Sequence, residues 1–224
     1  MKKLPFLFAL GLLLQGCFDN FEIEDNARLQ VTGSVTMPNN ASAGNIDVAL
    51  FDENRVLNSA TTTSNGTYNF ISLRSNAPEY DLIINNVSSE AFTKPIFKIF
   101  DTETTNIDAP NVTLETKARL DLSLRRTSNT TETLLWEIAY TSDRCIIFLD
   151  SPNPENTDSL ELEGCYETES FTGTISSNDD MVTDRNVLTI LGSEATLTYQ
   201  LGNQAPETIN IPINSTTTSY VLEY

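Results

Sequence analysis

Short runs in which apolar and polar residues alternate recur along the chain from residue 27 onward. A two-residue alternation is typical of β-strands with one buried face. Residues 29–37 alternate around Gly33, where a bulge or a close backbone approach is expected. After Cys17, no apolar run at helical spacing is long enough to indicate a helix. The pattern therefore predicts an all-β chain.

The first group of predicted strands occupies residues 27–115. Strands are expected at residues 29–37, 46–50, 67–70, 80–84, 92–100 and 112–114. Asn65-Gly66 lies between alternating runs and predicts a type I′ hairpin turn, since both residues accept positive φ. Pro95 lacks an N–H, so the strand at 92–100 is expected at a sheet edge or a bulge. This group predicts a β-sandwich.

The order of residues in this region resembles the carboxypeptidase regulatory-like domain, a small transthyretin-like β-sandwich. The resemblance rests on VTGSV, NIDVALFD, ATTTSNGTYNF and YDLIIN, which together span about 80 residues. The family usually has an Asp-Gly turn and a Gly-Ala-containing second strand, whereas this chain has Asn65-Gly66 and, in that strand, Asn45 and Asp47. The resemblance implies an accessory module without catalytic residues. A generic sandwich unrelated to that family is the alternative.

The second group of predicted strands occupies residues 117–224 and follows without a flexible linker, so the junction is expected to be stiff. Strands are expected at residues 120–124, 134–140, 145–149, 187–191, 197–201, 209–213 and 220–224. Another strand is expected to start at Leu160 and Leu162, and Tyr166 and Phe171 are expected to continue the core. Residues 145–149 are apolar on both faces and predict a central strand. The strand count suits an immunoglobulin-like sandwich. Trp136 is expected to be a core anchor of it.

The N-terminus carries the signature of a bacterial lipoprotein. Lys2 and Lys3 precede a short apolar run, residues 4–14, which fits a signal peptide over residues 1–16 and is too short to span a membrane. Leu14-Gln15-Gly16-Cys17 resembles a lipobox, which implies that Cys17 is lipidated and becomes the first mature residue. Gln15 departs from the usual residue at its position. An ordinary secretory signal is the alternative.

The segment after the cysteine, residues 17–26, is acidic and predicts a tether. It resembles the export signal that directs Bacteroidetes lipoproteins to the outer face of the outer membrane, and the bland alternative is a solvated spacer. An outer-membrane lipoprotein of the cell envelope is therefore expected, located on either the periplasmic or the cell-surface side of that membrane.

The charge of the chain limits its partners. There are 13 Lys and Arg residues against 31 Asp and Glu residues, a formal net charge of −18, and loss of Lys2 and Lys3 with the signal makes it more negative still. Such a chain repels phosphate backbones and anionic headgroups, so no nucleic-acid partner is expected. The expected membrane contact is the N-terminal lipid alone. A protein or glycan partner is left unidentified.

Cys145 and Cys165 remain after lipidation of Cys17. In an exported protein these two predict a disulfide, with two buried free thiols as the alternative. The bridge would connect neighbouring strands around the loop at residues 151–158.

The side-chain inventory argues against an enzyme. The chain has no histidine, which removes the commonest general base and His-ligated metals, and its glycines form no phosphate-binding loop. The abundant carboxylates leave a paired-acid glycosidase open on residue types, but no pair is singled out. Acidic loops around Asp179, Asp180 and Asp184 and at residues 150–158 could suit calcium, yet solvated loops are the favoured interpretation. No metal or cofactor is expected.

These features predict a lipid-anchored envelope protein with a non-catalytic binding or scaffolding role. A fimbrial subunit that exchanges its C-terminal strand, residues 220–224, between copies is one alternative. A surface carbohydrate-binding lipoprotein is another, and it requires exposed aromatic side chains on one face.

Overall fold

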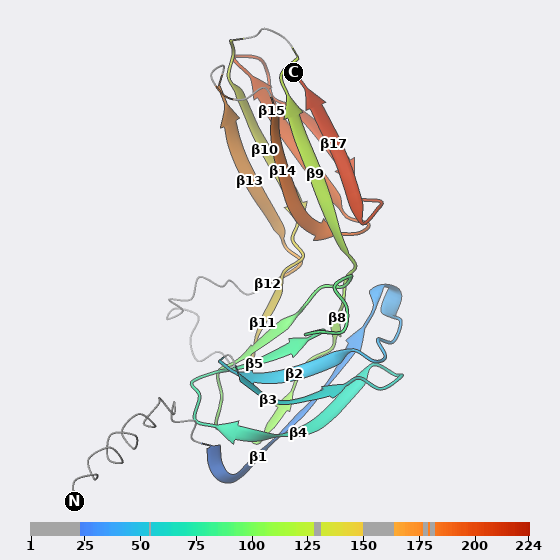
Figure 1. Ribbon diagram of the computed structural model, residues 1–224, viewed down its shortest axis with the longest axis vertical. Coiled ribbons are helices and arrows are strands. Elements are labelled where there is room, and N and C mark those ends of the chain that lie inside the picture. Colours follow the sequence, from blue (N-terminus) through green and yellow to red (C-terminus); the bar gives the residue numbers. More distant parts are fainter. Residues whose placement is uncertain (1–22, 54, 128–130, 150–163, 177–178, 180–181) are drawn as a thin grey trace, which may run out of the picture.

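The described part of the chain folds into β-sheets that form two stacked sandwiches (Figure 1). The computed structural model describes residues 23–53, 55–127, 131–149, 164–176, 179 and 182–224. Within these ranges the sole helical element is one 3₁₀ turn, η1 (Pro38–Asn40). No helix of the described part is long and apolar enough to cross a membrane. The predicted all-β fold with two sandwiches is confirmed.

The first sandwich consists of a four-stranded and a six-stranded sheet. The smaller sheet contains β1 (Ile23–Thr36), β4 (Thr67–Ser75), β7 (Asn106–Asp108) and β8 (Val112–Thr113). The larger sheet has the order β12 (Gly164–Cys165), β11 (Cys145–Leu149), β6 (Ile96–Ile99), β5 (Tyr80–Ile84), β2 (Asp47–Asp52) and β3 (Arg55–Thr61). Alternate residues of both sheets face each other, and Leu29, Leu50, Tyr80, Leu82 and Phe97 are fully buried between them.

The second sandwich consists of a four-stranded and a three-stranded sheet. The larger sheet has the order β13 (Thr168–Ile175), β10 (Leu134–Thr141), β15 (Glu194–Leu201) and β16 (Glu207–Pro212). The smaller sheet has the order β14 (Val182–Ile190), β9 (Lys117–Arg125) and β17 (Thr217–Glu223). Its separate core includes Leu120, Leu124, Leu134, Ile138 and Leu197. The C-terminal strand β17 pairs in parallel with β9 along its whole length.

One prediction about the second group of strands is wrong. Residues 145–149 were expected inside the second sandwich, but they form β11, which pairs in parallel with β6 of the first sandwich. The strand is central, as its apolar faces indicate, because β12 covers its other side. Likewise, Tyr166 packs against the first core. An apolar strand fits any buried sheet position, so the direction of the chain after β10 decides which sheet it joins.

The expected hairpin at Asn65-Gly66 is also wrong. β3 pairs with β2 and β4 pairs with β1, so the turn carries the chain from one sheet to the other. Gly66 has a φ of 80°, whereas Asn65 has no positive φ, so the turn is not type I′. The Gly66 N–H donates to the Thr63 carbonyl at 2.9 Å. Gly66 also lies so close to β1 that an added Cβ would be 2.3 Å from the Val35 oxygen.

Pro95 does not place its strand at an edge. β6 begins one residue later, at Ile96, and lies between β5 and β11. Because Pro95 is outside the strand, its missing N–H removes no bond from the sheet, while its carbonyl accepts from the Ile84 N–H at 3.0 Å. β6 is an interior strand because β11 pairs with its side that faces away from β5.

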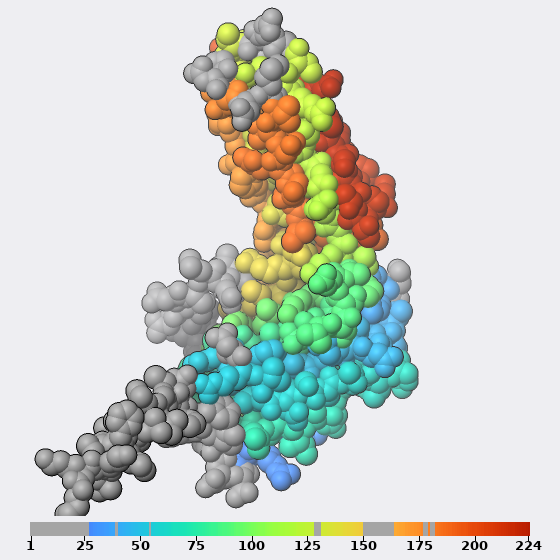
Figure 2. All heavy atoms as spheres, in the orientation of Figure 1, coloured from blue at the N-terminus to red at the C-terminus, as the bar shows by residue number. Residues whose placement is uncertain are grey.

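The two sandwiches form one elongated body (Figure 2), with the second sandwich above the first. The chain crosses between them three times: from β8 into β9, from β10 into β11, and from β12 back into β13. The start of β1 lies at the end of the first sandwich that faces away from the second (Figure 1).

The junction is held by hydrogen bonds. The Tyr166 hydroxyl donates to the Thr113 carbonyl at 2.6 Å and bonds the Thr93 hydroxyl at 2.8 Å. The Leu191 N–H donates to the Thr116 carbonyl at 2.9 Å. These contacts give the connection a defined geometry.

Candidate functional site

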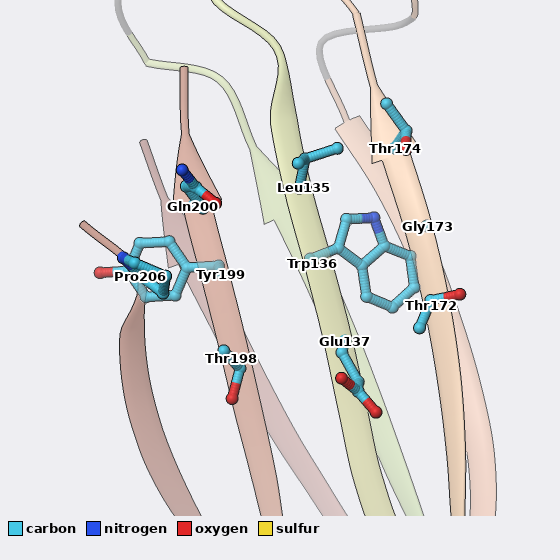
Figure 3. Close-up of a pocket in the computed structure, with 10 residues that line it drawn as sticks. All are labelled: Leu135, Trp136, Glu137, Thr172, Gly173, Thr174, Thr198, Tyr199, Gln200 and Pro206. Atoms are coloured by element: carbon cyan, nitrogen blue, oxygen red, sulfur yellow. The ribbon is translucent and has the colours of Figure 1, made fainter. Parts of the chain in front are cut away.

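Three hollows in the surface of the second sandwich share the strand β13. One hollow of about 530 Å³ lies on the outer face of the four-stranded sheet (Figure 3). Two others, of about 320 Å³ and 450 Å³, lie where β13 faces β14 of the opposite sheet. We call these two together the β13–β14 cleft. The gathering of hollows along one edge strand makes this region the candidate site.

The outer-face hollow is lined by both polar and apolar residues. β10 runs through its centre, with β13 and β15 on either side (Figure 3). Glu137, Thr172 and Thr198 occupy one cross-strand row, and Leu135 lies in the next row beside Gln200. Polar residues of this kind are ordinary on a solvent-facing sheet, so this hollow by itself indicates no chemistry.

Trp136 separates the outer-face hollow from the sandwich interior. Its side chain is 4% exposed and belongs to the second core, so the predicted core anchor is confirmed. The indole lies against Gly173, the cross-strand partner of Trp136, and a Cβ added at Gly173 would be 2.5 Å from two ring carbons. The Phe171 ring centroid is 5.5 Å from that of Trp136. The indole Nε1 is buried with no hydrogen-bond partner among the described residues.

The β13–β14 cleft is spanned at its middle by Phe171 and Arg185. Phe171 is paired with Ile138, and Arg185 with Leu122, so both side chains belong to faces that line the sandwich interior. The Arg185 guanidinium carbon lies 5.9 Å from the centroid of the Phe171 ring. Such a stack over an aromatic face is favourable electrostatically. Phe171 remains 45% exposed, because β13 is an edge strand and no further strand covers it.

Two carboxylates of the smaller hollow are engaged by the protein itself. Glu169 accepts a hydrogen bond from the Tyr140 hydroxyl at 3.3 Å and faces Arg144 at 3.6 Å. Asp143 lies 4.0 Å from the Lys117 ammonium. Burial, and then the Glu169 carboxylate, raise the pKa of Tyr140 above its usual value.

Two carboxylates of the larger hollow are engaged as well. Asp184 accepts from the Ser123 hydroxyl at 2.7 Å. Asp179 accepts from the Ser176 N–H at 2.6 Å, and the hydrogen bonds from Ser176 lower the pKa of this aspartate. Every described carboxylate that lines the cleft therefore has a hydrogen-bond or ion-pair partner within the protein.

Arg185 differs from these groups. Its Nη1 donates to the neighbouring Asp184 carbonyl at 2.9 Å, and no ion pair joins it to a carboxylate in the described ranges. It is also the one basic residue among the described residues that line the cleft. The arrangement presents a guanidinium and an aromatic face to solvent.

The cleft offers recognition chemistry. The chain has no histidine, and no group of three or more His, Cys, Asp or Glu side chains converges among the described residues. Of the loops considered for calcium, residues 150–158 and Asp180 lie outside the described residues. Asp179 and Asp184 are held by separate serines, as described above.

The predicted disulfide is present. Cys145 and Cys165 are bonded, and they are cross-strand partners in β11 and β12, so the bridge joins neighbouring strands as expected. The predicted lipidation site, Cys17, lies outside the described residues.

Sequence reasoning missed Phe171 and Arg185 as site residues. Phe171 was assigned to the core, and Arg185 was not considered. The alternation of Thr183, Arg185 and Val187 could have identified Arg185, because it places this charged side chain on the face of the strand that is directed toward the core.

Comparisons with known proteins assign no family. No protein-family model matches the chain, and no curated protein is similar to it in sequence. The Bacillus anthracis TIE protein is 10% identical, with a TM-score of 0.32 over 88% of this chain and 34% of that one. The shaft pilin SpaA of Lactobacillus rhamnosus GG is 8% identical, with a TM-score of 0.31 over 88% and 97%.

A third match is the carbohydrate-binding module CBMbc of Eubacterium rectale, solved with maltoheptaose. It is 11% identical, with a TM-score of 0.29 over 88% of this chain and 92% of that one. Similarities this distant identify neither a family nor a function.

Proposed function

We propose that the protein is a lipid-anchored cell-envelope protein that binds a ligand without chemically changing it, through the β13–β14 cleft. The observation that carries the proposal is the contact between Phe171 and Arg185 across the β13–β14 cleft. The Arg185 guanidinium is stacked and accessible, while the surrounding carboxylates already have donors from the protein. A guanidinium that uses one hydrogen bond within the protein and keeps other N–H groups for a ligand is typical of a recognition site.

The arrangement of the sandwiches supports the anchored part of the proposal. The start of β1 lies at the end of the molecule opposite the second sandwich (Figure 1). A lipid on Cys17 would therefore hold the first sandwich toward the membrane and the cleft away from it. The hydrogen-bonded junction would keep that orientation.

The anchor is tested with labelled palmitate. The wild-type protein is expected to incorporate the label and fractionate with membranes. Cys17→Ser is expected to lose both properties. Equal fractionation of the two forms would remove the anchor from the proposal.

The binding role is tested with mature chain carrying Cys17→Ser, which retains every described residue. It is applied to arrays of glycans and peptides, in parallel with Phe171→Ala and with Leu73→Ala as a matched control. Leu73 is 43% exposed on the first sandwich, so its truncation removes similar surface far from the cleft. Retention lost only in Phe171→Ala is the expected result. Retention that ignores Phe171→Ala, or none at all, would contradict the proposed role.

A further inference from the structure

Arg185 is an unusual residue for this chain. The formal net charge is −18, so an exposed cation has many carboxylates available to it. Arg119, on the neighbouring strand β9, illustrates this with a 2.8 Å contact to Asp121. Arg185 has no such contact in the described ranges, although Asp143, Glu169 and Asp184 line the same cleft.

The absence of an ion pair at Arg185 has a structural cause. The side chain points toward the sandwich interior and stacks on Phe171, whereas the nearby carboxylates are held by Tyr140, Lys117 and Ser123. The guanidinium donates to the Asp184 carbonyl and keeps further N–H groups for a carboxylate that approaches from solvent. Within the described residues, Arg185 is therefore left open to an anion from outside the chain.

The rest of the cleft indicates what carries that anion. Phe171 offers an exposed aromatic face, and Thr183, two residues from Arg185 on the same face of β14, adds a hydroxyl to the larger hollow. A hydroxyl beside an aromatic face complements a ring that has both apolar and hydroxylated surfaces. The volumes of about 320 Å³ and 450 Å³ on either side of Arg185 are at the lower end of those of small-molecule sites.

We propose that the β13–β14 cleft binds the terminal sugar of a glycan through a single carboxylate on that sugar, with Arg185 as the residue that selects for the charge. This inference rests on the proposed binding role and specifies its ligand. A single carboxylate fits better than a polyanionic chain. The strongly negative protein repels a chain of repeated negative charges, whereas the one guanidinium in the cleft attracts a single carboxylate.

Trp136 provides the readout, since it is the one tryptophan in the chain and it lines the larger hollow. The mature chain with Cys17→Ser is titrated with 3′-sialyllactose and, separately, with lactose, which lacks the acidic sugar. Tryptophan emission and saturation-transfer NMR of the ligand are recorded for each. Binding of 3′-sialyllactose is expected, with no measurable binding of lactose.

Three variants separate the role of charge from that of fold. Arg185→Gln is expected to weaken 3′-sialyllactose binding about tenfold or more, because it removes a charge-assisted hydrogen bond. Arg185→Lys keeps the positive charge but lacks the planar guanidinium, and its affinity for 3′-sialyllactose is expected to lie between those of wild type and Arg185→Gln. Arg119→Gln removes the same charge from the same sheet outside the cleft, and its affinity is expected to stay within about twofold of wild type. Equal binding by wild type and Arg185→Gln, with both folded, would overturn the assignment.

A peptide arm distinguishes failure of this inference from failure of the binding role. Ala-Ala-Phe with a free C-terminus and its amidated form present a carboxylate from a different source. Binding of the free peptide but not of 3′-sialyllactose would overturn the glycan assignment and leave the cleft as a binding site. An array signal that depends on Phe171 but not on Arg185 would have the same meaning. If neither probe binds and Phe171→Ala changes nothing on the arrays, both proposals fail.

Discussion

At the scale of single residues, each sandwich contains a glycine that lies under an aromatic ring of the neighbouring strand. Gly33 is the cross-strand partner of Tyr68, and Gly173 is the partner of Trp136. A Cβ at Gly33 would be 2.2 Å from the Tyr68 hydroxyl, and one at Gly173 would be 2.5 Å from indole carbons. The absence of a side chain at each glycine therefore leaves space for the aromatic ring of its cross-strand partner to lie against the sheet. The expected close approach at Gly33 is confirmed, and the register there continues without a bulge.

Gly173→Ala is expected to destabilise the second sandwich by about 1–3 kcal/mol, because the added methyl group has no room beside the indole. Denaturant unfolding followed by Trp136 emission measures the change. Gly44→Ala is the control, since its nearest contact would be 3.3 Å and its cost should be clearly smaller. Equal stabilities of Gly173→Ala and wild type would show that the indole moves aside freely.

Buried tyrosines predict a loss of stability at alkaline pH. Burial raises the pKa of Tyr166 from its usual 10.0 to about 12, and it raises the pKa of Tyr68 as well. A raised pKa in the folded state means that the contribution is complete below pH 10 and is lost as the pH rises from about 10 to 12. For Tyr166 the loss amounts to about 2–3 kcal/mol by pH 12.

The unfolding free energy of wild type and Tyr166→Phe should be compared at several pH values between 8 and about 12. The variant is expected to start less stable by about 1 kcal/mol, since it lacks the hydroxyl that bonds Thr113 and Thr93. Its decline with pH should be shallower. Parallel declines would show that Tyr166 does not contribute to the alkaline transition.

At the scale of elements, the small ribbon of β11 and β12 connects the two halves of the chain. It lies between β10 and β13 in sequence, both in the second sandwich, yet it extends the sheet of the first. The disulfide between Cys145 and Cys165 joins its two strands. The ribbon gives β6 a partner on its otherwise open side, so that β6 is an interior strand and the short β12 becomes the sheet edge.

Reduction of the disulfide is expected to lower the unfolding free energy by roughly 3 kcal/mol, given the sequence separation of 20 residues. Unfolding with and without a phosphine reductant measures the effect. The double variant Cys145→Ala with Cys165→Ala should be insensitive to the reductant, and a reductant effect that persists in it would locate the cause elsewhere.

The C-terminal strand bears on the alternative of a fimbrial subunit. β17 pairs with β9 over seven residues, from Thr217 to Glu223, and Leu222 is buried in the second core. Because the strand already occupies its place, we expect the purified protein to remain monomeric and to form no SDS-resistant polymers. Deletion of residues 217–224 should lower the stability of the second sandwich. Polymers that disappear with this deletion would favour strand exchange instead.

At the scale of the whole molecule, three chain crossings and the Tyr166 contacts predict that the two sandwiches unfold together. Trp136 emission reports on the second sandwich, and far-ultraviolet circular dichroism reports on both. The two unfolding curves are expected to coincide in the oxidised protein and to separate after reduction, because reduction weakens the ribbon of the first sandwich that connects β10 and β13 of the second. Separate curves before reduction would show that the sandwiches are energetically independent.

The amino-acid sequence alone determined the kind of structure and its local elements. Alternating residues such as Leu120, Leu122 and Leu124 indicate a strand with one buried face, since successive side chains on a strand point to opposite faces. Cys145 and Cys165 could be paired because few cysteines were available, and Trp136 could be placed in the core because its neighbours share its phase.

The tertiary structure decided which strands meet. Cys145–Leu149 is apolar on both faces, which fits the interior of either sandwich, and only the course of the chain after β10 brings it to β6. The cleft was hidden for the same reason. Phe171 and Arg185 lie on separate sheets, and nothing local records that their side chains stack. Patterns along a strand report which side is buried, whereas a contact between sheets depends on how distant segments are packed.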